Sequence, residues 1–170
     1  MAYKILILVV GFYFLAIAQM SFFPTLSILG VTPNLVLIGV CLLGFFEKKT
    51  TYSGISGVLT GGLLLDIFSH TFIGASVAAY LITYLLLKEI LRQLQDVSRN
   101  YSFLYFAPII IISVVFYDFL LSLFYYLGDL RILFSFNIYA SLVRILYTLG
   151  VGTIAFYIFK TASLKLNESK

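Results

Sequence analysis

Long apolar runs separated by short polar segments dominate this chain. Residues 5–46 contain no charged side chain, and further apolar runs follow as far as residue 159. A helix needs roughly 20 residues to cross about 30 Å of hydrocarbon. Because the runs are continuous and do not alternate with polar positions, they predict helices and not barrel strands. We expect one domain over residues 1–170 with six membrane-spanning helices, at residues 5–23, 33–46, 51–69, 73–91, 103–127 and 134–159.

The second expected span is short, and its beginning carries a helix-start signal. Its length over residues 33–46 gives a rise of only about 21 Å. Thr32 and Pro33 fit an N-cap followed by proline at the first helical position. Either this helix begins part-way into the bilayer, or residues 26–31 extend it above a proline kink. Non-helical backbone at that depth must be shielded by protein, so we expect the Pro33 end to face neighbouring helices.

The composition indicates an all-α integral membrane protein. Of the 170 residues, 62% are apolar and 11% are charged. In soluble domains roughly 45–50% of residues are apolar and roughly 25% are charged. These proportions exclude a water-soluble globule. They also exclude a nucleic-acid-binding domain, because the basic residues that give the net charge of +4 are scattered at the ends of apolar runs. The single cysteine, Cys41, and the single histidine, His70, exclude an internal disulfide and a multi-histidine or cysteine-based metal centre.

The basic residues predict the orientation. With six spans, nine of them fall on one side of the membrane and Arg131 falls on the other, while Arg144 lies within a span. The positive-inside rule places both termini in the cytoplasm, with residues 160–170 as a short cytoplasmic tail. Residues 88–100 form either a helical extension at the lipid surface or a solvated loop. The nine are Lys4, Lys48, Lys49, Lys88, Arg92, Arg99, Lys160, Lys165 and Lys170.

Apart from Lys88 and Glu89 at the end of the fourth span, three charged side chains lie inside the expected spans: Asp66, Asp118 and Arg144. Each costs roughly 2.5–3.5 kcal/mol on insertion scales, so each is a candidate functional residue. Asp118 and Arg144 fall at the same depth on sequential antiparallel helices, which predicts an ion pair. The pair either locks the fifth and sixth spans together or belongs to a polar cavity, which Asn34, Asp66 and Ser113 would also line.

Asp66 lies about a turn from the end of the third span. Its carboxylate either reaches the lipid headgroups, accepts hydrogen bonds from the start of the fourth span near residues 73–75, or contacts a ligand or partner. No second carboxylate or histidine has a spacing that would complete a catalytic site, and we expect His70 to be an interfacial loop residue. The chain also lacks nucleotide-binding, zinc-protease and serine-hydrolase motifs. We therefore expect a non-enzymatic protein without a cofactor or metal.

Small residues concentrate on the third and fourth spans. Two glycines four residues apart allow helix backbones to approach closely, and alanines at the same spacing follow on the next span. This arrangement predicts a tight hairpin of the two spans; the alternative is oligomerisation or docking of a foreign helix. The residues are Gly54, Gly57, Gly61, Gly62, Ala75 and Ala79.

Several of these positions form a recognisable pattern. Thr32-Pro33-Asn34-Leu35-Val36-Leu37 opens it, Gly57-Val-Leu-Thr-Gly61-Gly62-Leu63-Leu64-Leu65-Asp66 follows, and Gly74 and Tyr80 complete it. Together these motifs resemble the rod shape-determining protein MreD family of bacterial inner membranes. The resembling stretch covers about a third of the chain.

The resemblance implies a scaffold in the machinery that directs cell elongation and lateral peptidoglycan synthesis. The implied partners are MreC, a single-span membrane protein, and also RodA, the elongation-specific penicillin-binding protein and MreB. It further implies a fold similar to the substrate-binding subunits of energy-coupling-factor transporters, so a subunit that binds a vitamin-like small molecule is the alternative. A third possibility is a binder or flippase of a lipid-linked precursor, with a lateral groove lined by Asp66, Asp118 and Arg144.

Overall fold

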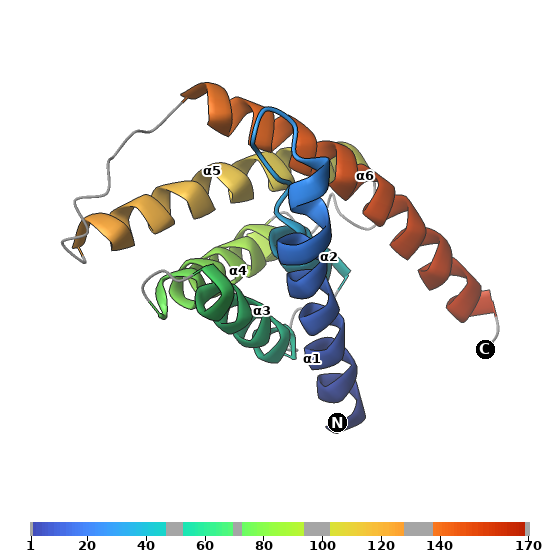
Figure 1. Ribbon diagram of the computed structural model, residues 1–170. Helices are drawn as coiled ribbons and strands as arrows, with labels where there is room; N and C mark the ends of the chain where they lie inside the picture. Colours follow the sequence, from blue (N-terminus) through green and yellow to red (C-terminus); the bar gives the residue numbers. More distant parts are fainter. Residues whose placement is uncertain (1, 47–52, 70–72, 94–102, 128–137, 169–170) are drawn as a thin grey trace.

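Six α-helices make up most of the described chain (Figure 1). The structure is a computed structural model that describes residues 2–46, 53–69, 73–93, 103–127 and 138–168. Within those residues the chain forms no β-strand beyond one isolated bridge, so the all-helical prediction is confirmed. The helices are α1 (Ala2–Ile17), α2 (Leu35–Phe46), α3 (Gly54–Ser69), α4 (Ala75–Gln93), α5 (Phe103–Leu127) and α6 (Ile138–Glu168).

The helix bounds follow the predicted spans with some shifts. α5 matches the span predicted over residues 103–127. α4 begins at Ala75 and not at residue 73, because Gly74, with a φ of +106°, still belongs to the turn before it. α6 continues to Glu168, so residues 160–168 of the expected cytoplasmic tail are helical, and their side of the membrane stays a prediction.

Among the described residues, three helical segments are long and apolar enough to cross a membrane: Tyr3–Leu26, Phe103–Leu127 and Tyr139–Thr161. α2 and α3 are apolar but shorter, and the 12 residues of α2 rise only about 18 Å. These lengths fit a membrane protein, while the full set of six crossings stays a prediction.

The chain leaves the α-helical form between α1 and α2. α1 continues into a π-helical turn (Ala18–Phe22) and a 3₁₀ turn (Phe23–Leu26). Leu29 and Gly30 then reverse the backbone with φ values of 54° and 76°, the positive φ at both central residues that a two-residue hairpin favours. This short hairpin delivers the chain to the start of α2.

α2 begins at Leu35, so the predicted cap at Thr32 and first helical residue at Pro33 are wrong. Asn34 is the cap: its Oδ1 accepts a hydrogen bond of 2.9 Å from the Leu37 N–H. Asparagine is a stronger N-cap than threonine, and it stands where its oxygen reaches the first turn. Pro33 and Asn34 are both buried, as expected for a helix start shielded by its neighbours.

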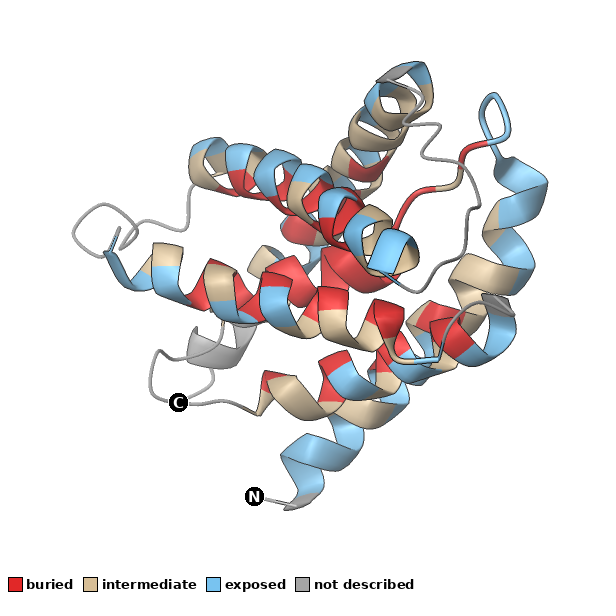
Figure 2. Ribbon diagram, turned by 90° about the vertical axis from the view of Figure 1, so that its left-hand side faces the viewer, coloured by how far each residue is buried: buried red, intermediate tan, exposed pale blue. Residues whose placement is uncertain are grey.

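α2 forms the centre of the bundle and contacts each of the other five α-helices. Most of its side chains are buried around the whole helix, whereas the other helices bury one face and expose the other (Figure 2). The outer faces carry large exposed apolar residues such as Leu63, Ile112 and Ile154. Apolar surface of this extent suits contact with lipid or with other membrane helices.

An aromatic cluster joins three helices at the C-terminal end of α2. The rings of Phe45, Phe106 and Phe156 lie 4.6–5.8 Å apart between centroids. They come from α2, α5 and α6 and are buried. This contact fixes α5 and α6 against the central helix.

The glycines of α3 pack against three helices, since a Cβ at Gly61 would also lie 2.9 Å from Val36 on α2. A Cβ added at Gly57 or Gly61 would lie 2.7–2.8 Å from the ring of Phe12 on α1. A Cβ at Gly62 would lie 2.7 Å from the Cα of Val77 on α4. The Gly57-x-x-x-Gly61 face therefore meets α1, and the prediction that it forms the hairpin contact with α4 is wrong.

The hairpin contact itself comes from the remaining small residues. A Cβ at Gly54 would lie 2.6 Å from the hydroxyl of Tyr84 on α4. Ala75 and Ala79 are buried on α4. Since all six small residues are buried within the chain, they serve internal packing.

We predict that Gly62→Ala lowers the stability of the detergent-solubilised protein by about 1–3 kcal/mol. The added methyl group meets the backbone of Val77, which cannot rotate away as a side chain can. Thermal unfolding followed by circular dichroism measures the change. Gly11→Ala is the matched control, since nothing lies within 4 Å of a Cβ at that helical position. Equal melting temperatures for both variants would contradict the close α3–α4 contact.

Candidate functional site

The buried N-terminus of α2 is held by polar side chains from four helical segments. The Val36 N–H donates to Gln19 Oε1 at 3.0 Å, and the Asn34 N–H donates to Thr148 Oγ1 at 3.2 Å. Tyr80 on α4 donates its hydroxyl hydrogen to Asn34 Oδ1 at 2.8 Å. We call Gln19, Asn34, Tyr80 and Thr148 the α2 cap cluster. It links the π-helical turn after α1, together with α4 and α6, to the start of α2.

The cap cluster continues into α5 through aromatic stacking. The rings of Tyr80 and Tyr117 are stacked at 4.3 Å between centroids, with an interplanar angle of 22°. Both side chains are buried. Tyr117 directly precedes Asp118, so the uncharged cluster lies beside the charged pair.

Asp118 and Arg144 form the predicted ion pair between α5 and α6. Arg144 Nη1 donates to Asp118 Oδ1 at 2.8 Å. The two side chains differ in exposure: Asp118 is 9% exposed and Arg144 is 38% exposed. The depth argument from the sequence therefore identified the contact, and the structure adds that only the arginine reaches the surface of the bundle.

Asp66 caps α4 from the neighbouring helix α3. Its Oδ2 accepts hydrogen bonds from the N–H groups of Gly74 (2.8 Å) and Val77 (3.3 Å), and its Oδ1 accepts one from Ser76 (2.9 Å). The residue is 1% exposed. Of the three expected roles, hydrogen bonding to the start of the next helix is confirmed, and reaching the headgroups is excluded by the burial.

Within the described part of the chain, the candidate residues make separate sets of contacts. Asn34 belongs to the cap cluster, Asp66 is used by α4, and Asp118 faces Arg144. Asp66 and Asp118 are both buried, so of the three residues expected to line a lateral groove only Arg144 is partly exposed.

Ser113 lies in a different place, at a small cavity between α4 and α5. The cavity measures about 20 Å³, which suits about one water molecule. No charged side chain lines it, and the other lining residues are Leu86, Leu87, Ile90, Ile109 and Ile112.

Sequence reasoning missed most of the cap cluster. Gln19 is a polar residue inside the uncharged N-terminal run, and its position was the available signal. Tyr80 appeared only as part of the family resemblance, and Thr148 gave no signal in a helix with several small polar residues.

Other expectations concern residues that the structure describes only in part. α4 extends to Gln93, which favours the helical alternative for residues 88–93. The remaining residues 94–100 lie outside the described chain, as do His70, Arg99, Arg131, Lys48 and Lys49.

No catalytic or metal-binding arrangement emerges within the described residues. No three His, Cys, Asp or Glu side chains there are close enough together to hold a metal ion. Comparison with family models, with curated proteins and with solved structures finds no match. A function for this chain must therefore be inferred from the arrangement of its polar groups.

We predict that Asp66→Ala destabilises the protein by about 2 kcal/mol or more, because three N–H groups at the start of α4 lose their acceptor. Thermal unfolding in detergent measures the loss. Asp66→Asn keeps one side-chain oxygen and should lose less. An alanine variant as stable as the wild type would contradict the capping role.

We predict that Asp118→Ala destabilises the protein by about 2–4 kcal/mol, somewhat below a fully buried pair because Arg144 is partly exposed. The exchanged variant Asp118→Arg with Arg144→Asp restores the attraction and should regain part of this loss. Unfolding of the two variants in the same detergent tests the pairing. An exchange variant no more stable than Asp118→Ala would contradict it.

Proposed function

We propose that this chain is a non-enzymatic scaffold in the bacterial cytoplasmic membrane that holds MreC within the cell-elongation machinery and so supports cell shape. In this proposal six helices cross the membrane and both termini are cytoplasmic. The observation that supports it is the distribution of polar and apolar side chains in the bundle. Asn34, Asp66 and Asp118 are used in internal contacts, while the outward faces are apolar.

The residues behind the MreD resemblance support the proposal by their positions. Asn34 and Tyr80 are hydrogen-bonded to each other, and Asp66 is hydrogen-bonded to Gly74. The pattern thus consists of residues that build the interior. A scaffold binds its partners through the shape of its helix surfaces. It therefore depends on a well-packed interior and not on a reactive side chain.

The exposed side of the α3–α4 hairpin is the proposed binding surface for the transmembrane helix of MreC. The buried glycines cannot serve, since this chain already covers them. With the Gly62–Val77 contact facing inward between the two helices, helical spacing places two apolar stripes on one side of the pair. The stripes are Leu59, Leu63 and Ile67 on α3 and Ile82 and Leu85 on α4.

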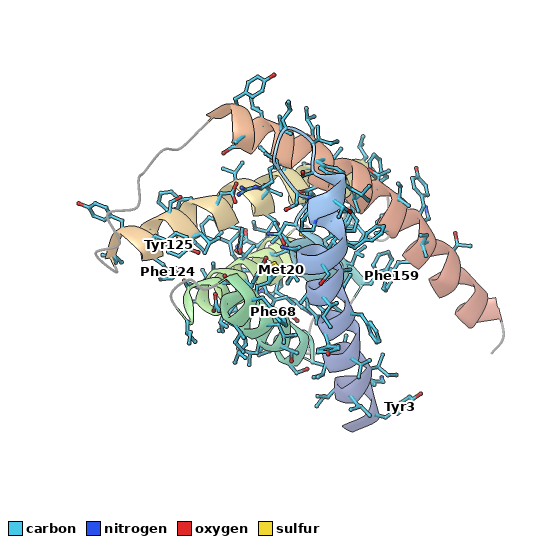
Figure 3. All side chains as sticks on the ribbon, in the orientation of Figure 1. Tyr3, Met20, Phe68, Phe124, Tyr125 and Phe159 are labelled. Atoms are coloured by element: carbon cyan, nitrogen blue, oxygen red, sulfur yellow. The ribbon has the colours of Figure 1, made fainter. Side chains whose placement is uncertain are left out.

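Lipid offers no hydrophobic drive for helix association, so a partner must gain van der Waals contact along such a surface. α1 and α6 also expose apolar side chains, and Tyr3 projects away from the other helices in Figure 3. They are further surfaces for RodA, the elongation-specific penicillin-binding protein or lipid, whereas MreB would be met on the cytoplasmic side.

The resemblance also proposes a fold like that of the substrate-binding subunits of energy-coupling-factor transporters. A vitamin-like ligand would need a much larger polar pocket than the 20 Å³ apolar cavity beside Ser113, which is one cavity among the described residues. We prefer the scaffold because Asn34, Asp66 and Asp118 all make contacts within the chain. A small molecule that copurifies with the protein would reverse that preference.

Site-specific photocrosslinking tests the scaffold. A photoreactive phenylalanine analogue replaces Leu63 on the proposed surface, and the same analogue at Leu146, an exposed residue of α6, is the matched control. With MreC coexpressed, we expect a crosslink to its single helix from position 63 and not from position 146. Failure of MreC to copurify in mild detergent, together with normal cell shape after depletion of this chain, would overturn the proposal.

A further inference from the structure

The ion pair of Asp118 and Arg144 presents its positive end at the surface. The carboxylate is almost wholly buried at 9% exposure, whereas the guanidinium-bearing side chain is 38% exposed. Although the pair is neutral overall, an outside group lies closer to the positive charge than to the negative one. In a medium of low dielectric constant that difference in distance favours an anion.

Arg144 has more N–H groups than its hydrogen bond to Asp118 uses. A guanidinium carries several N–H groups in a planar fork. Within the described residues its one hydrogen bond goes from Nη1 to Asp118 Oδ1. The exposed faces of α5 and α6 carry large apolar residues, among them Phe119, Leu142 and Leu146. Leaving the remaining N–H groups in hydrocarbon would be costly, so they favour a polar partner, which a group from outside the bundle can supply.

The depth of Arg144 suits a lipid headgroup. It lies five residues into the apolar segment Tyr139–Thr161, or about 8 Å along the helix. Long basic side chains reach the headgroup layer from such depths. Exposed tyrosines prefer that layer, and Tyr126 at the end of α5 and Tyr139 at the start of α6 are both strongly exposed. Tyr125 lies toward the same end of α5 (Figure 3).

We propose that Arg144 binds the phosphate group of an anionic phospholipid at the edge between α5 and α6. Asp118 positions the guanidinium through its hydrogen bond to Nη1, and the free N–H groups of the fork donate to phosphate oxygens. The site would exist whatever protein the bundle holds. It would join the α5–α6 pair to the membrane leaflet on the side where those two helices are connected.

Native mass spectrometry of the detergent-solubilised chain, titrated with phosphatidylglycerol, tests the site. The double variant Asp118→Asn with Arg144→Gln is neutral at both positions and avoids a buried unpaired charge. We expect it to bind the first phosphatidylglycerol about tenfold more weakly than the wild type, the scale of one charge-assisted hydrogen bond. Asp118→Asn alone removes the opposing charge and keeps an acceptor oxygen, so we expect it to bind more tightly than the wild type.

Arg92→Gln is the matched control, because Arg92 is also a surface arginine paired to a carboxylate, Glu89, at 2.8 Å. We expect it to leave the first binding step unchanged. Equal weakening by Arg92→Gln and the double variant would overturn the site in favour of general surface charge. Unchanged binding by the double variant would overturn it as well.

Discussion

Every backbone N–H and C=O group that leaves a regular helix in an apolar surrounding needs a partner from the protein, and this constraint shapes the bundle. It acts most strongly between α1 and α2, where the chain turns before the central helix begins. The first turn of α2 takes its acceptors from Gln19 and from Asn34, and Asn34 is in turn held by Tyr80 and Thr148. Because these partners come from the π-helical turn after α1, from α4 and from α6, capping one helix fixes the relative positions of three other segments.

The same rule explains the charged residues. Asp66 supplies acceptors to the start of α4, and Asp118 accepts from Arg144. Each carboxylate is desolvated, and each is compensated by N–H donors from a neighbouring segment, as burial requires. These polar side chains join helices, and much of the remaining surface is apolar. A bundle built this way offers shape and contact area to its surroundings, and Arg144 is partly exposed at the α5–α6 edge.

Close packing of small residues is the second device, and it works locally. Gly57 and Gly61 admit the ring of Phe12, and Gly62 admits the backbone of Val77. α3 therefore lies against α1 on one face and against α4 on the other. The two contacts bury the small residues from any foreign helix, so a partner must meet the larger side chains that point outward.

The sequence by itself determined the helices of the bundle and the polar contacts between helices that follow one another in the chain. Continuous apolar runs predicted the helices, with α5 in full agreement. Asp66 is separated by a short turn from the N–H groups that donate to it. Asp118 and Arg144 lie on consecutive antiparallel helices, so the rise per residue was enough to predict that they are at the same depth. Only the tertiary structure decided which helix fills the Gly57–Gly61 face, and which residue caps α2. It also brought together Asn34 and Thr148, which are 114 residues apart in the chain. Periodicity gives the direction in which a side chain leaves its own helix, whereas the neighbour that it meets depends on how all the helices pack at once.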